Sequence, residues 1–213
     1  TRVLGQYDPY GSPRLVLVAP NLVEVSRQMP APRSQFALWV CVHEQTHALQ
    51  FAAAPWLADH LRGEAQALLG SLQTPGKELE AVLGHLARAV RGGDGSPLAA
   101  FLDEEQRARL DRVTAVMSLL EGHADVAMDR VPVGVLPAKR RLRARMEARR
   151  SAGGVQKVVR RLIGLDAKLA QYRDGAVHRA APDALDVVWT APEALPSLAE
   201  LGDPEAWLRR TRP

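Results

Sequence analysis

The sequence predicts a mainly helical α+β fold with one minor sheet, and three observations support this prediction. Long stretches such as 36–54 contain neither Gly nor Pro, so helices can run through them without interruption. Residues 14–19 form the one clear strand candidate, because they are rich in Leu and Val and are followed by Pro20. The 213 residues are 46% hydrophobic and 24% charged, which is typical of a globular protein that can bury an ample core.

The expected helices begin at capping residues or prolines and end at Gly or Pro. Asn21 can cap a short helix that continues to Met29, and Ser34 can cap the helix that contains 36–54. An extended connection is expected at 131–137, because it holds two prolines and a glycine. The remaining helices are expected over 55–72, 77–91, 98–130, 138–150, 155–172, 182–188, 197–201 and 204–210.

Residues 43–47 read His-Glu-Gln-Thr-His and are the most informative motif of the chain. Four residues make just over one helical turn, so His43 and His47 project from the same helix face and can hold one zinc ion. Glu44 follows the first of them and can act as a general base on a water at the metal. The alternative is a helix whose two histidines have this spacing by chance. The apolar run 36–42 argues against this alternative, because a helix that is apolar on all sides is buried. Two histidines and a glutamate in the interior need polar or metal partners.

Two carboxylates, Glu121 and Asp125, are also spaced by four residues, within the helix expected over 98–130. A catalytic zinc with two histidines needs a third protein ligand, and Glu121 can supply it. Asp125 could then accept the free ring N–H of His43 or His47 and orient that ring. His123 is the alternative ligand, but it lies about 200° around the helix from Glu121, so both cannot easily face one metal. The other reading of this pair is a solvated helix face.

These motifs together resemble a bacterial family of zincin-like metallopeptidases with a gluzincin-like ligand arrangement. The matching stretches are LGQYDPY (4–10), LVAPN (17–21), LWVCVHEQTH (38–47), PWL (55–57), LLEGHADVAMD (119–129), GLDAKLAQYRDG (164–175) and DPEAWLRR (203–210). The resemblance implies a single zincin-like domain over 1–213, a helical excursion at 56–98 and a Zn²⁺ cofactor. Members of this family are often labelled as associated with deazaflavin coenzyme biosynthesis. They usually carry more sequence upstream, so we expect that an N-terminal region is missing here.

Two further residues are candidates for transition-state stabilisation. Tyr172 or His178 could donate a hydrogen bond to the oxyanion of a tetrahedral intermediate. Tyr172 lies within one of the stretches that resemble the family, but the resemblance assigns it no role. The other reading for Tyr172 is a core residue whose hydroxyl has a partner.

Composition limits the cellular compartments and the partners that we expect for this protein. No apolar run is long enough for a transmembrane helix. Cys41 is the single cysteine, so no internal disulfide can form, and we expect a cytoplasmic protein. Residues 139–161 contain ten Lys or Arg against one acid, which leaves the rest of the chain at −5 when the total is +4. This basic segment has no aromatic residue for base stacking, which argues against nucleic acid; an exposed helix or a contact with an anionic partner explains it better.

The sequence therefore predicts a zinc-dependent hydrolase, and a metallopeptidase before other hydrolases. The metal would be bound by His43, His47 and Glu121, with Glu44 as the general base and a peptide or protein as the substrate. Two alternatives remain: a degenerate zincin with a structural zinc, and a binding module that acts through the basic segment.

Overall fold

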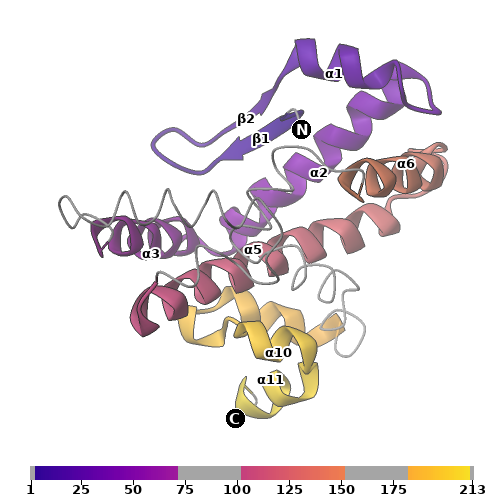
Figure 1. Ribbon diagram of the computed structural model, residues 1–213. Coiled ribbons are helices and arrows are strands. Elements are labelled where there is room, and N and C mark those ends of the chain that lie inside the picture. The colour runs from indigo at the N-terminus through magenta and orange to yellow at the C-terminus, as the bar shows by residue number, and fades with distance from the viewer. Residues whose placement is uncertain (1–2, 72–101, 152–181, 212–213) are drawn as a thin grey trace. The chain divides into compact units, whose positions relative to one another are not determined.

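The computed structural model describes residues 3–71, 102–151 and 182–211, and its elements are predominantly helical (Figure 1). The chain divides into two compact units. The first joins Thr1–Ala58 to Leu120–Gly153, and the second joins Asp59–Leu119 to Gly154–Pro213. The mainly helical fold with a minor sheet is confirmed. The organisation as a single domain stays a prediction, and most of the expected excursion at 56–98 lies outside the described residues.

The sheet of the first unit is a hairpin of two strands, β1 (Gly5–Asp8) and β2 (Arg14–Leu17). The strands are antiparallel, with Gly5 opposite Leu17 and Tyr7 opposite Leu15. Strand β2 was predicted, whereas β1 was not, because Gly5 and Asp8 are residue types with low strand propensity. Strand β1 packs on the long helix α2, where the Tyr7 and Phe51 rings lie 5.7 Å apart.

The first unit also contains the helices α1 (Ala19–Ser26), α2 (Arg33–Ala53) and α6 (Lys139–Ser151), and the second half of α5 (Glu104–Arg130). Their apolar faces form one core. Phe36 and Val40 of α2, Leu142 of α6 and Leu136 before it are almost completely buried within it. This packing buries one face of α2, the helix that carries His43 and His47.

Three local predictions in the first unit are wrong in detail. Asn21 does not cap α1, which begins at Ala19; its side-chain amide donates to the carbonyl of Val3 at 2.7 Å. Ser34 lies inside α2, whose N-cap is Pro32. Residues 131–137 form turns rather than an extended segment, since the amide groups of residues 135 and 136 both donate to the carbonyl of Pro132. Asn21 and Ser34 are residue types that favour N-caps, but both helices begin earlier in the chain than expected.

The described helices of the second unit are α3 (Leu57–Ser71), the first half of α5, the 3₁₀ helices η1 (Pro182–Trp189) and η2 (Pro192–Ala194), α10 (Leu198–Gly202) and α11 (Pro204–Thr211). Trp207 is fully buried in a small core, and its ring N–H donates to the carbonyl of Ala194 at 2.8 Å. Ser197 and Glu200 form a capping box at the start of α10. A hydrogen bond from Arg210 lowers the pKa of Glu200 to about 2.

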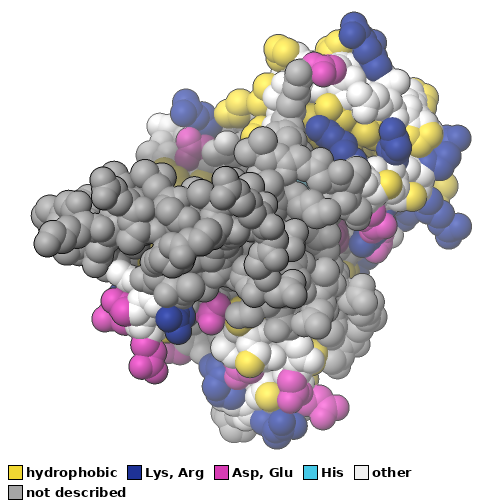
Figure 2. Space-filling model, in the orientation of Figure 1, with side chains coloured by type: hydrophobic (Ala, Val, Ile, Leu, Met, Phe, Trp, Pro, Cys, Tyr) yellow, Lys and Arg dark blue, Asp and Glu magenta, His cyan; other side chains and the backbone are white. Residues whose placement is uncertain are grey.

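Helix α6 presents its basic side chains at the surface and buries its apolar ones. Leu142 is fully buried, whereas Arg140, Arg141 and Arg145 are exposed. Lys and Arg side chains gather on the side of the view where α6 lies (Figure 2). Acidic neighbours neutralise part of this charge, since Arg143 pairs with Asp129 at 2.6 Å and with Glu147 at 3.0 Å. Across the described residues, no helix has the length and apolarity that crossing a bilayer requires.

Candidate metal centre

Helices α2 and α5 bring the three predicted metal ligands together within the first unit. The distance from the Nε2 atom of His43 to that of His47 is 3.3 Å. One oxygen of the Glu121 carboxylate lies 3.5 Å from Nε2 of His47, and the other lies 3.7 Å from Nε2 of His43. The two imidazoles are mostly buried, whereas the Glu121 side chain is 42% exposed, so the cluster opens to solvent on the side of the carboxylate.

These distances fit a tetrahedral metal ion. Zinc binds imidazole nitrogen and carboxylate oxygen at about 2.0–2.2 Å, and a tetrahedron of that size separates its ligand atoms by about 3.4 Å. The separation of the two Nε2 atoms lies close to this value, and each Nε2 atom has one of the two Glu121 oxygens at a similar distance. Among the described residues, His43, His47 and Glu121 form the group positioned to hold a metal ion. Two nitrogens and one oxygen are a donor set typical of a catalytic zinc site, which keeps a position for water or substrate.

The electrostatics of the cluster favour a positive charge between its members. Burial disfavours the protonated form of His47, but the hydrogen bond and the negative charge of Glu121 outweigh it and raise the pKa of His47. Gln50 and Glu44 act in the same direction. The same negative charges would stabilise a metal cation between the imidazoles and Glu121. This is a second observation that supports a metal site here.

Gln50 orients the cluster and was missed by the sequence analysis. Its side chain is only 1% exposed. The amide nitrogen lies 2.9 Å from the carbonyl of Leu120 and 2.8 Å from Nδ1 of His123, and the amide oxygen lies 2.8 Å from Nδ1 of His47. Because a carbonyl can only accept, the nitrogen of Gln50 must face Leu120, and its oxygen must accept from His47. With a metal ion bound, His47 would therefore keep its proton on Nδ1 and direct the lone pair of Nε2 at the ion.

Gln50→Leu is expected to weaken zinc binding about 10–100-fold, the usual cost of removing a group that orients a metal-binding histidine. The leucine preserves the volume but accepts no hydrogen bond from His47. The affinity can be measured by competition with a chromophoric chelator. Gln45→Leu is the matched control, because Gln45 lies on the same helix but is exposed. Equal zinc affinity of the two variants would contradict the role of Gln50.

The structure places the other two α5 candidates as follows. The ring of His123 points to Gln50, and burial, together with the charges of Arg130 and His47, lowers its pKa. A neutral His123 suits its acceptance of a hydrogen bond from Gln50. Asp125 is buried, and its backbone carbonyl accepts from Arg143 at 3.1 Å. Because Gln50 takes the ring N–H of His47, an orienting role for Asp125 toward His43 stays a prediction.

Glu44 lies beside the cluster and faces strand β1. The amide of Val18 donates to the carbonyl of Leu4, so these two residues form a hydrogen-bonded pair of the hairpin. Hydrogen-bonded and non-hydrogen-bonded pairs alternate along antiparallel strands, so the backbone N–H and C=O groups of Gly5 and Tyr7 point away from β2. The backbone N–H of Tyr7 donates a hydrogen bond to the Glu44 carboxylate. Burial, and then the charge of Glu121, raise the pKa of Glu44 against the opposing effects of His47 and Tyr7. A raised pKa brings a carboxylate closer to what a general base needs near neutral pH.

Gly5 permits this close approach because it has no side chain. A Cβ atom at Gly5 would lie 2.7 Å from Cγ of Glu44 and 3.1 Å from its carboxyl carbon. Gly5→Ala is therefore expected to displace Glu44 and to lower the stability of the protein by about 1–3 kcal/mol, while zinc content stays unchanged. Chemical denaturation and metal analysis measure the two effects. Gly63→Ala, where the added methyl meets nothing within 4 Å, is the control. Undiminished stability of Gly5→Ala would show that β1 adjusts freely.

Tyr172 and His178, the candidates for oxyanion stabilisation, lie outside the described residues, as does the basic stretch 152–161. Their roles stay predictions.

The chain is similar to proteins that are already known. A family model described as zincin-like metallopeptidase matches residues 1–208. The chain is also similar to a crystal structure from Chloroflexus aurantiacus, described as a hydrolase candidate with a novel fold, with 31% sequence identity and a TM-score of 0.66. That similarity covers 98% of this chain and 63% of the other, so this chain spans less than two thirds of the solved protein. No curated protein matches the chain.

Proposed function

Because the chain belongs to the zincin-like metallopeptidase family, we propose that it is a zinc-dependent hydrolase whose substrate is a peptide bond. The family and the similar solved structure both support a hydrolase. The observation that carries the proposal is the cluster of His43, His47 and Glu121 with Glu44 at its side. The Nε2 atoms of His43 and His47 lie 3.3 Å apart, and each is 3.5–3.7 Å from a different oxygen of the Glu121 carboxylate, which supports a shared zinc ion. Glu44 beside this group could accept and release protons.

Each residue of the site has a distinct part in the proposed reaction. His43, His47 and Glu121 would hold the ion, and a zinc ion bound there would lower the pKa of water to about 7 and polarise the substrate carbonyl. Glu44 would accept a proton from the attacking water and pass it to the leaving amine. The backbone N–H of Tyr7 restrains the carboxylate of Glu44 for both transfers. Gln50 keeps the proton of His47 on Nδ1, away from the metal side.

Zinc-loaded protein incubated with a broad library of peptides tests the proposal. We expect cleavage that stops when a chelator removes the metal and returns when zinc is restored. Mass spectrometry of the products identifies the bonds that are cleaved. If zinc-loaded protein cleaved no member of the library, the proposed activity would be contradicted, and a binding role through the exposed basic side chains of α6 would take its place.

A further inference from the structure

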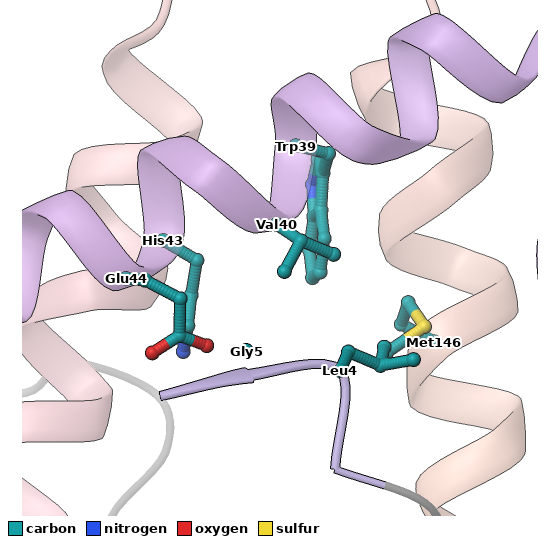
Figure 3. A pocket seen from close by; sticks show the side chains of 7 residues that line it. All are labelled: Leu4, Gly5, Trp39, Val40, His43, Glu44 and Met146. Carbon is teal, nitrogen blue, oxygen red and sulfur yellow. The ribbon is translucent and has the colours of Figure 1, made fainter. Parts of the chain in front are cut away.

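A pocket opens directly beside the metal cluster, within the first unit. Its volume is about 160 Å³. Figure 3 shows His43 and Glu44 at one end, Trp39 and Val40 on the same helix, and Leu4 and Gly5 of the β1 segment across from them. Met146 of α6 closes the far side. The pocket therefore begins at the proposed general base and leads away from it along α2.

The walls of the pocket are apolar away from the metal cluster. Leu4, Trp39, Val40 and Met146 supply this part of the lining, and the ionisable side chains among the described lining residues, His43 and Glu44, lie at the other end. Trp39 and Val40 are themselves 5% and 3% exposed and belong to the core, so their positions are set by packing. The Trp39 ring also stacks on the His43 ring, with centroids 6.0 Å apart and planes 10° apart. The packing of Trp39 and Val40 therefore forms the pocket before a ligand binds. The stacking of Trp39 on His43 links the wall of the pocket to the metal cluster.

The size and location of the pocket suit one amino-acid side chain. An apolar protein cavity of about 150 Å³ can bind benzene, so this pocket can take a group of the size of a leucine or phenylalanine side chain. Trp39 and Val40 each lie four residues, a rise of roughly 6 Å, before His43 and Glu44 on α2. This distance is within reach of the side chain on a residue next to the scissile bond, since neighbouring Cα atoms are about 3.8 Å apart.

We propose that this pocket selects substrates with an apolar side chain of leucine to phenylalanine size on a residue next to the scissile bond. The proposal rests on the proposed hydrolase function and adds the substrate class to it. Glu44 at the entrance repels an acidic side chain, and the apolar walls beyond it offer a carboxylate no hydrogen-bond partner. A small side chain such as that of alanine would leave most of the pocket unfilled and bury little apolar area.

Simple hydroxamates, which chelate zinc through two oxygens, test the pocket without needing a known substrate. Two series are used, one with the alkyl group on the carbonyl carbon and one with it on the nitrogen, so that both sides of the metal are probed. We expect the 4-methylpentanoyl or the corresponding N-alkyl compound to bind zinc-loaded protein at least tenfold more tightly than acetohydroxamate. Each buried methylene contributes about fourfold in affinity. A carboxylate-bearing compound of similar size should gain nothing.

Substitutions from two different elements link this gain to the pocket. Met146→Trp and, independently, Leu4→Trp are expected to fill it and to reduce the gain below threefold, with zinc content and acetohydroxamate affinity unchanged. Met146→Leu is the control and should keep the full gain, because it nearly conserves volume. Wild-type protein that binds acetohydroxamate but shows no dependence on the alkyl group would overturn the pocket while leaving the hydrolase proposal intact. A gain that persists in both tryptophan variants would do the same. If no hydroxamate bound at all, the metal-based function would be contradicted, and the pocket assignment with it.

Discussion

Glu44→Gln is expected to lower the rate of hydrolysis about 10²–10⁴-fold, the range for loss of a positioned general base, without loss of zinc. Glutamine has nearly the same volume, and its amide oxygen can still accept the backbone hydrogen bond of Tyr7. It cannot take up a proton from the attacking water, so the chemical step loses its base while the site keeps its shape. The measurement is kcat/KM on a peptide identified from the library, together with zinc content.

The comparison needs a control with the same chemical change at a site far from the metal. Glu205→Gln serves, because the Glu205 side chain is 82% exposed on α11. Its activity should match that of the wild type. Cleavage that continues unchanged in Glu44→Gln would have to come from another site or from a contaminating peptidase, and Glu44 would then lose its proposed role.

The double variant His43→Ala/His47→Ala is expected to retain less than a tenth of the zinc of the wild type, which should bind about one ion per chain. Two of the three proposed ligands disappear, and the Glu121 carboxylate, which is 42% exposed, would by itself be a weak site. Because metal binding stabilises the folded state, the wild type should also gain stability on adding zinc, by about 2.7 kcal/mol at a concentration 100 times the Kd. The double variant should gain almost none.

Elemental analysis and thermal denaturation with and without zinc measure both effects. His60→Ala is the control, since His60 lies on α3 in the second unit and outside the metal group. It should bind zinc and respond to it like the wild type. Full retention of zinc by the double variant would refute the proposed site.

The sequence by itself determined the elements that a local pattern can encode. The spacing of His43 and His47 places both on one helix face whatever the rest of the fold does, because an α-helix repeats every 3.6 residues. The same rule pointed to Glu121, and the resemblance to zincin-like metallopeptidases is confirmed by the family match. The mainly helical fold followed from long segments without Gly or Pro, which set helix formation locally.

Only the tertiary structure decided what surrounds those residues. Gln50 could not be distinguished from Gln45 by residue type or propensity, and it became part of the site because α5 brings Leu120 and His123 against it. Strand β1 has a weak local signal, yet its pairing with β2 and its contact with α2 place Gly5 and Tyr7 at Glu44. The pocket likewise combines side chains more than 100 positions apart, Leu4 and Met146. Such contacts depend on how apolar faces pack over long separations along the chain, and no local sequence pattern specifies that packing.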